Sequence, residues 1–230
     1  IDVKRDLSLK LAFVGAEPWT EAMRSEINYR LNLQAINYYG ISEIIGPGVA
    51  SEYLEDLDGP TIWEDHFYPE IIDPETGKVL PDGEFGELVI TSLTKEATPV
   101  IRYRTKDLTR LLPGTSKTMR RLERFKGRSD DMLIIRGVNI FPSQVEEEIL
   151  KLPALSAQYQ IHVYKNRNLD ELEVWVEPRV DATSKEVQKS KITLEESIKA
   201  WTGVRAKVLI RPLASIERSI GKAIRVIDKR

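Results

Sequence analysis

The 230-residue sequence contains no cysteine and only two histidines, His66 and His162. Disulfides, thiolate nucleophiles, cysteine-bound zinc and iron–sulfur clusters are therefore excluded. The two imidazoles lie far apart in the chain and have no carboxylate cluster beside them, so they support neither a histidine-based metal site nor a Ser–His–Asp triad. Chemistry that depends on a cysteine or histidine nucleophile is thus poorly supported.

An excess of positive charge and a long apolar run are also missing. The 34 Lys and Arg against 36 Asp and Glu leave a formal charge of −2, whereas a dedicated nucleic-acid binder usually carries a strong basic excess. No apolar run approaches the roughly 20 residues that span a bilayer, and the N-terminus shows no signal-peptide pattern. We expect a folded cytoplasmic protein with no nucleic-acid and no membrane partner.

Residues 1–129 read as mixed α/β structure followed by a β-rich segment. Leu7–Gly15 is typical of a buried strand, although it lies close to the start of the sequence. The sequence also begins with Ile1 rather than Met, so we expect a piece of a longer polypeptide. Apolar spacing predicts a helix, and short alternating runs predict strands. The helix carries Met23, Ile27 and Leu31; strands are expected at residues 35–39 (stopped by Gly40), 87–91, 108–112 and 120–125, with turns at Thr76-Gly77, Asp82-Gly83 and Pro113-Gly114.

Residues 130–230 read as a small α+β unit that follows the polar stretch Gly127–Asp131. Pro142 fits the first turn of a helix, where its missing N–H costs nothing, and Val145, Ile149 and Leu152 line the inner face of that helix. A second helix is expected to carry Leu194, Ile198 and Trp201, and strands are expected at residues 132–135, 158–164, 172–176, 208–210 and 223–227.

Two polar segments at strand ends could bind a ligand. Gly15-Ala16-Glu17-Pro18 follows the first strand, where small residues let a ligand approach the backbone, but on this motif alone an ordinary strand–helix loop is the simpler interpretation. In Tyr38-Tyr39-Gly40-Ile41-Ser42-Glu43 the aromatic residues could stack on a base, Ser42 could bind phosphate and Glu43 could hold a hard cation. A strand that ends in a polar turn remains the alternative.

The segment 102–128 holds ten Lys or Arg and only two acids, Asp107 and Glu123. Within it, Tyr103-Arg104-Thr105-Lys106-Asp107 places a carboxylate after a strand, and a carboxylate can accept both hydroxyls of a ribose. A surface ion pair of Asp107 with Arg104 or Lys106 is the simpler interpretation. The basic side chains could face phosphates, or they could lie solvated on a β-hairpin.

The motif Gly127-Arg128-Ser129-Asp130-Asp131, followed by the strand 132–135 and Arg136-Gly137-Val138-Asn139, makes the pattern specific. Together with residues 13–19 and 40–48, it resembles the adenylate-forming enzymes, and most closely their phenylacetate–CoA ligase branch. The resemblance runs over nearly the entire chain in the right motif order. It implies that residues 1–129 are the C-terminal part of the large AMP-binding domain (α/β plus a β-barrel-like subdomain) and that residues 130–230 are the small α+β lid domain.

The resemblance also implies a nucleotide site. Gly15, Ala16, Glu17 and Pro18 match the loop around the adenine, and Tyr39, beside Tyr38 and Gly40, matches the aromatic residue that packs on it. Ser42 matches the hydroxyl near the α-phosphate, and Glu43 matches the magnesium ligand. Asp107 and Arg128 match the residues that contact the ribose of ATP or AMP.

For the second half of the reaction, the resemblance implies a moving lid. Asp130 matches the hinge, Gly137 the loop that lines the pantetheine tunnel of coenzyme A, and Gly221-Lys222 the catalytic lysine motif. Lys222 and Glu43 would thus be the catalytic residues of an ATP-dependent acid–thiol ligase acting on phenylacetate or a similar carboxylate. Members of this family are often dimers, so the resemblance also allows a homodimer.

Three features depart from the family pattern. Lys106 stands where many members have glycine, and no proline precedes the lysine motif at Ile216-Glu217-Arg218. The Ser/Thr/Gly-rich loop that cradles the outer phosphates is missing; in the family it lies upstream, so we expect a fragment that is inactive alone. An adenylating enzyme with another acid or acceptor, as in coenzyme F390 synthetase-like relatives, and a non-catalytic nucleotide-binding module remain alternatives.

Overall fold

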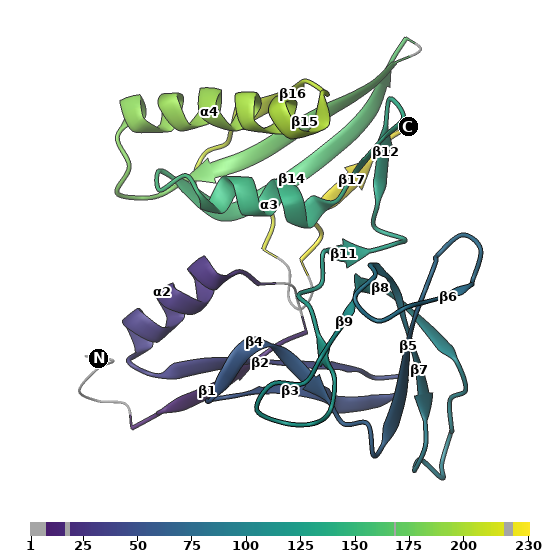
Figure 1. Ribbon diagram of the computed structural model, residues 1–230. Coiled ribbons are helices and arrows are strands. Elements are labelled where there is room, and N and C mark those ends of the chain that lie inside the picture. The colour runs from purple at the N-terminus through teal and green to yellow at the C-terminus, as the bar shows by residue number, and fades with distance from the viewer. Residues whose placement is uncertain (1–7, 17–18, 168, 219–222) are drawn as a thin grey trace. The chain divides into compact units, whose positions relative to one another are not determined.

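The computed structural model describes residues 8–16, 19–167, 169–218 and 223–230 (Figure 1). The chain divides into two compact units, Ile1–Asp130 and Asp131–Arg230. Within the described residues, no helix combines the length and the apolar character needed to cross a membrane.

The first unit contains a six-stranded sheet in the order β1-β2-β3-β4-β10-β9. β1 (Leu11–Val14) runs parallel to β2 (Gln34–Ile41), and the helix α2 (Glu21–Leu31) connects them. α2 begins after Thr20, whose hydroxyl accepts from the Met23 N–H at 3.2 Å, and it ends at Asn32 in the left-handed conformation. Capping at both ends fixes the helix that the apolar spacing predicted.

Two details of this sheet correct the sequence interpretation. β1 is a strand but is not buried: it lies at the sheet edge, and Phe13 is 63% exposed. β2 does not stop at Gly40 but continues to Ile41, because a register shift opposite β3 (Ile45–Tyr53) between Tyr39 and Ile41 absorbs the glycine. A glycine inside a strand often marks such an irregularity rather than an end.

The rest of the first unit is β-rich. β4 (Asp56–Ile62) pairs with β10 (Arg121–Leu122), which forms a short hairpin with β9 (Leu111–Leu112) around Pro113-Gly114 as predicted. A five-stranded sheet has the order β11 (Gly127–Arg128), β8 (Tyr103–Thr109), β7 (Gly86–Ser92), β5 (Phe67–Ile72) and β6 (Val79–Leu80). In the part of the chain that is described, its strand pairing leaves β11 and β6 as edges and does not close into a barrel.

The second unit is an α+β layer structure. Its sheet has the order β16 (Ala206–Ile210), β15 (Leu169–Pro178), β14 (Leu155–Asn166) and β17 (Val226–Asp228). α3 (Pro142–Leu150) and α4 (Ser184–Thr202) lie over one face of this sheet (Figure 1). β12 (Leu133–Ile135) and β13 (Val138–Ile140) form a separate hairpin.

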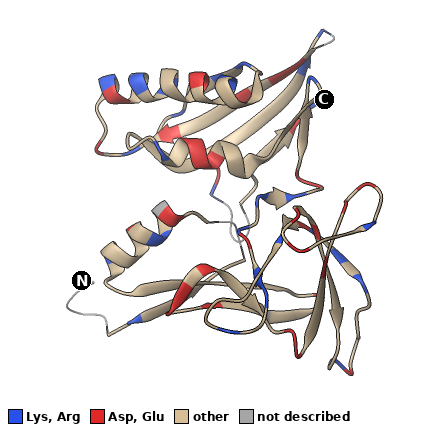
Figure 2. Ribbon diagram, in the orientation of Figure 1, with Lys and Arg blue, Asp and Glu red and all other residues tan. Residues whose placement is uncertain are grey.

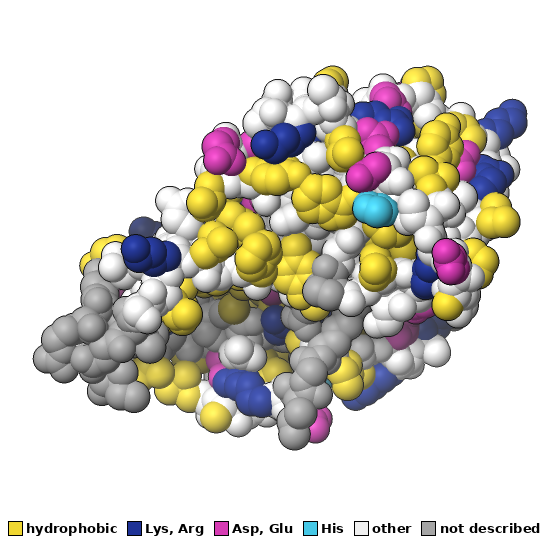
Figure 3. Space-filling view, turned by 90° about the horizontal axis from the view of Figure 1, so that it is seen from below, with side chains coloured by type: hydrophobic (Ala, Val, Ile, Leu, Met, Phe, Trp, Pro, Cys, Tyr) yellow, Lys and Arg dark blue, Asp and Glu magenta, His cyan; other side chains and the backbone are white. Residues whose placement is uncertain are grey.

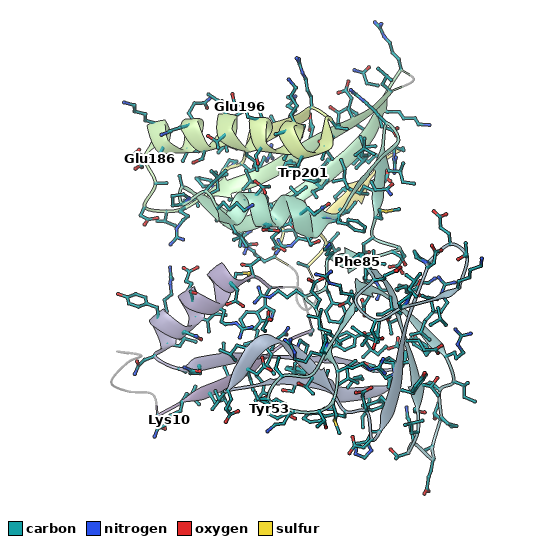
Figure 4. All side chains as sticks on the ribbon, viewed as in Figure 1. Lys10, Tyr53, Phe85, Glu186, Glu196 and Trp201 are labelled. Atoms are coloured by element: carbon teal, nitrogen blue, oxygen red, sulfur yellow. The ribbon has the colours of Figure 1, made fainter. Side chains whose placement is uncertain are left out.

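The helices of the second unit follow the sequence signals. Pro142 is the first residue of α3, and Val145 and Ile149 are fully buried, whereas Leu152 lies beyond the helix end. Glu186, which is labelled in Figure 4, completes a capping box with Thr183 at the start of α4. Leu194 and Ile198 enter the core, and Trp201, near the other end of α4, stays 36% exposed.

Candidate functional site

The Asp107 carboxylate on β8 forms the centre of the candidate site. The Tyr39 hydroxyl, from the neighbouring sheet, donates a hydrogen bond to Asp107 Oδ2 at 2.6 Å. On the other side, Arg128 Nη1 lies 3.6 Å from Asp107 Oδ1, because Arg128 on β11 stands directly opposite Asp107 in the antiparallel register. Three residues that the sequence separates by up to 89 positions therefore converge.

Tyr39 is held from two directions. Its ring stacks on Phe125 with centroids 4.5 Å apart and an interplanar angle of 29°, a geometry that favours aromatic pairs. Burial, reinforced by the Asp107 carboxylate, raises the pKa of Tyr39 well above its ordinary value. The hydroxyl thus remains a proton donor to Asp107 at neutral pH, and it fixes the orientation of that carboxylate.

Arg128 is shared between two carboxylates. Besides its contact with Asp107, its Nε and Nη2 atoms each donate to Asp130 at 2.8 Å, a bidentate pair. These hydrogen bonds lower the pKa of Asp130. The Arg128 guanidinium therefore connects Asp107, a predicted ribose contact, with Asp130, the predicted hinge residue.

The loop after β1 lies against β2. Val14 pairs with Asn37, and a Cβ atom on Gly15 would lie only 2.4 Å from the Tyr38 carbonyl oxygen. Only glycine permits this close approach. Trp19 Nε1 donates to Asn37 Oδ1 at 3.0 Å. The structure thus brings Gly15 and Tyr38 together; Glu17 and Pro18 lie outside the described residues.

Tyr38 and Tyr39 serve different faces of the sheet, as successive strand residues do. Tyr38 lines an apolar groove of about 850 Å³, which also includes Phe13, Ile36, Tyr53 and Trp63. Tyr53 is labelled in Figure 4, and Figure 3 shows hydrophobic side chains gathered across the face that it views. Of the two predicted tyrosines, only Tyr39 contacts Asp107 in the described structure.

Ser42 and Glu43 occupy the exposed turn between β2 and β3. The Lys95 ammonium group donates to the carbonyl oxygens of Glu43 and Ile44 at 3.2 and 2.6 Å, which fixes the turn. Among the described residues, no group of three or more His, Asp or Glu side chains could hold a metal ion. The role of Glu43 as a magnesium ligand therefore stays a prediction.

In the second unit, Gly137 lies in the turn between β12 and β13. Its φ is 79°, and Arg136 before it has a φ of 53°. A Cβ atom on Gly137 would meet no atom within 4 Å, so the positive φ rather than crowding favours glycine here. Arg136 Nε donates to the Asp170 carbonyl oxygen at 2.8 Å, which ties the turn to the adjacent hairpin.

The predicted lysine motif lies outside the described residues, which end at Arg218 and resume at Ala223. The segment before the gap is anchored on Glu177 of β15, a carboxylate that is 1% exposed. Glu177 accepts from the backbone N–H groups of Ala214 and Ile216 at 3.0 and 2.8 Å and from both terminal nitrogens of Arg218. The role of Gly221 and Lys222 as the catalytic lysine motif therefore stays a prediction.

Most of the ten basic side chains in 102–128 are neutralised by carboxylates. The pairs join Arg102 with Glu70, Arg104 with Glu87, Arg110 with Glu123, Arg120 with Glu64 and Asp82, and Arg121 with Asp56 and Asp58. Figure 2 shows acidic and basic segments interleaved through the first unit. The Arg102, Arg104 and Arg110 side chains nevertheless stay 53%, 40% and 41% exposed, so these basic side chains are both paired with carboxylates and solvated.

Sequence reasoning missed the residues that support this site. Thr105 is 3% exposed; its hydroxyl donates to the Leu88 carbonyl and accepts from the Asp107 N–H at 3.1 Å. Glu87 is fully buried. A single glutamate inside the apolar run Gly86-Glu87-Leu88-Val89-Ile90 could have drawn attention, because a buried charge requires partners.

Comparison with known proteins relates this chain to coenzyme A ligases. The family of AMP-binding enzyme C-terminal domains matches residues 137–230. The phenylacetate-coenzyme A ligase of Pseudomonas putida is 56% identical over 98% of this chain and 52% of that enzyme, and its Escherichia coli K12 counterpart is 58% identical over 97% and 52%. The crystal structure of 2-hydroxyisobutyryl-CoA ligase with R3-HIB-AMP, in the postadenylation state, superimposes with a TM-score of 0.86 and 28% identity over 96% of this chain and 48% of that one.

The fold is thus that of the C-terminal half of adenylate-forming CoA ligases. The chain spans about half the length of the curated relatives it matches. Within this class, it is a homologue of the phenylacetate-coenzyme A ligases and covers their C-terminal half.

Proposed function

We propose that this chain is one half of an ATP-dependent acid–thiol ligase that converts phenylacetate, or a similar aryl carboxylate, into its coenzyme A thioester. This half would contain nucleotide-binding residues and the lid domain. Residues 1–129 would be the end of the large AMP-binding domain, and residues 130–230 the lid domain. The sequence identity to phenylacetate-coenzyme A ligases supports the substrate class.

The convergence of Tyr39, Asp107 and Arg128 carries the proposal. A carboxylate held between a phenol and a guanidinium presents acceptor oxygens in a fixed orientation, and paired acceptors suit the two hydroxyls of a ribose. The Arg128 guanidinium adds donors beside them. Gly15 lets the backbone after β1 approach Tyr38 of β2 closely, and its small size would leave a border for an adenine.

The reaction has two steps. A carboxylate oxygen of the acid attacks the α-phosphorus of ATP; an acyl–phosphate bond forms, the bond to the β-phosphate oxygen breaks, and pyrophosphate leaves. The thiolate of coenzyme A then attacks the acyl carbonyl, and AMP leaves. Neither step needs a protein nucleophile, consistent with a chain without cysteine.

Each predicted residue has a role in these steps. Lys222 and a magnesium ion held by Glu43 would stabilise the charge that develops on the phosphoryl oxygens, and Ser42 would bind the α-phosphate. Rotation about Asp130 would then exchange the lysine segment for the Gly137 turn, which would line the path of the thiol. Arg128, as the partner of Asp130, would connect nucleotide binding to this rotation.

Calorimetric titration of the chain with AMP tests the nucleotide site. We expect saturable binding that Asp107→Asn weakens by about tenfold, because a charged acceptor for the ribose hydroxyls is lost. Asp82→Asn changes a carboxylate that pairs with Arg120 away from the Asp107 cluster and should leave the affinity unchanged. Equal affinities for wild type and Asp107→Asn would refute the assignment.

The acid and the acceptor require a separate assay. Pyrophosphate release by the full-length enzyme, measured with a panel of aryl acids and with or without coenzyme A, would distinguish a phenylacetate–CoA ligase from an adenylating relative with another acceptor. Preference for phenylacetate together with coenzyme A-dependent thioester formation is expected. Turnover with a different acid, or without any thioester product, would favour the alternative.

A further inference from the structure

The strand that carries Asp107 is irregular at the residues just before this carboxylate. In the pairing of β7 with β8, Glu87 stands opposite Leu108 and Val89 opposite Arg104. Leu88 alone therefore faces the three residues Thr105, Lys106 and Asp107. Bulges of this kind re-aim side chains and are common next to active sites.

The bulge is centred on a strained residue. Lys106 has a φ of 68°, in the left-handed region that favours glycine. A lysine in this conformation persists only where the surroundings hold it.

Glu87 supplies that hold from inside the protein. This carboxylate is 0% exposed, and its Oε1 atom accepts the Lys106 N–H at 3.2 Å. Arg104 locks the carboxylate with two hydrogen bonds of 3.0 and 2.5 Å. On the other side of the same residue, the Lys106 carbonyl accepts the Ser129 N–H at 2.7 Å. Both backbone groups of Lys106 are thus fixed.

We propose that Glu87 is a positioning residue for nucleotide recognition: through the Lys106 N–H it maintains the bulge that aims the Asp107 carboxylate at the ribose hydroxyls. Glu87 itself lies on the neighbouring strand β7 and is fully buried, so it would not touch the nucleotide. The inference rests on the proposed nucleotide site, because it explains how Asp107 reaches that site. It adds a residue that acts on ribose recognition from the protein interior.

Discrimination between AMP and 2′-deoxy-AMP measures this role directly. We expect the wild-type chain to prefer AMP by about tenfold, the value of one hydrogen bond to a charged acceptor, and we expect Glu87→Gln to bring that ratio close to one. Adding Lys106→Gly should restore the ratio, because glycine adopts the positive φ without the carboxylate. A residue that served only core stability would not be rescued in this way.

Two further variants complete the design. Glu70 lies on β5, the strand beside β7, and its carboxylate pairs with Arg102 at 3.0 Å. Glu70→Gln removes this carboxylate and should keep the wild-type ratio. Lys106→Val leaves Glu87 intact but places a β-branched residue at the positive φ, so it should lower the ratio even if Glu87→Gln fails to fold.

The outcomes separate two kinds of failure. The positioning role is wrong if wild type prefers AMP and both Glu87→Gln and Lys106→Val keep that preference. It is also wrong if adding Lys106→Gly to a folded Glu87→Gln variant does not restore the preference. In either case the nucleotide site itself stands. If wild type shows no preference for AMP, the proposed ribose contact of Asp107 fails, and this inference fails with it.

Discussion

Replacing Glu177 with glutamine tests how residues 214–218, which precede the predicted lysine motif in the sequence, are anchored. The wild-type carboxylate is buried and accepts four hydrogen bonds, two from backbone N–H groups and two from Arg218. Glutamine keeps one oxygen but turns an NH₂ group toward one backbone donor and one guanidinium nitrogen. A hydrogen bond to a charged group contributes about 1.5–3 kcal/mol to stability. The Arg218 side chain is 46% exposed, and solvent screening therefore reduces the contribution of its hydrogen bonds to Glu177. We expect the free energy of unfolding to fall by about 2–3 kcal/mol.

The pH dependence of this loss identifies its cause. Burial alone would raise the pKa of Glu177, but the hydrogen bonds from Arg218, Ile216 and Ala214 outweigh burial and lower it. A lowered pKa gives stability that is present above the unfolded-state pKa and lost as the pH falls through the folded-state pKa.

Urea denaturation at neutral pH should therefore separate the variant from wild type, and the gap should close below about pH 4. Glu196→Gln, at an exposed position of α4 that Figure 4 labels, should stay within about 0.5 kcal/mol of wild type at either pH. A Glu177→Gln variant as stable as wild type at neutral pH, or a gap that does not depend on pH, would refute the anchoring argument.

Three other outcomes follow from the proposed function. The 230-residue chain alone should show no ATP–pyrophosphate exchange with phenylacetate, since the phosphate loop of the family is missing from it, and measurable exchange would contradict the need for that loop. In the full-length enzyme, Lys222→Ala should cripple adenylation yet largely spare thioester formation from supplied acyl-AMP, and an equal loss of both half-reactions would contradict its role. Tyr39→Phe should weaken AMP binding about fivefold by releasing the Asp107 carboxylate, whereas Tyr29→Phe, on the exposed side of α2, should bind AMP like wild type.

Local sequence signals predicted the elements of the fold well where one factor dominates. The spacing of Met23, Ile27 and Leu31, together with the caps at Thr20 and Asn32, determines α2. Pro142 marks the start of α3 because its fixed backbone angle suits that position. Gly40 misled, because its backbone freedom serves an irregularity in the β2–β3 pairing as readily as it serves a strand end.

The site was less accessible to sequence reasoning because its contacts are long-range. Asp107 and Arg128 lie in the same basic segment of the sequence, but their contact depends on the register between β8 and β11. The hydrogen bond from Tyr39 to Asp107 joins two different sheets. The strand expected within Leu7–Gly15 was wrongly predicted to be buried, since an apolar residue on an edge strand, such as Phe13, can remain exposed. Glu87 was the hardest residue to predict from the sequence. Nothing in the sequence around it indicates that its carboxylate accepts a hydrogen bond from a backbone N–H nineteen residues away.

A crystal structure of the chain with AMP would test the central claim most directly. The proposal predicts that both ribose hydroxyls donate to Asp107 at about 2.6–3.0 Å, with Arg128 beside the ribose and the adenine between Tyr39 and the Gly15 loop. An AMP molecule bound elsewhere, for example in the apolar groove lined by Phe13 and Trp63, with Asp107 still bonded only to protein, would contradict it.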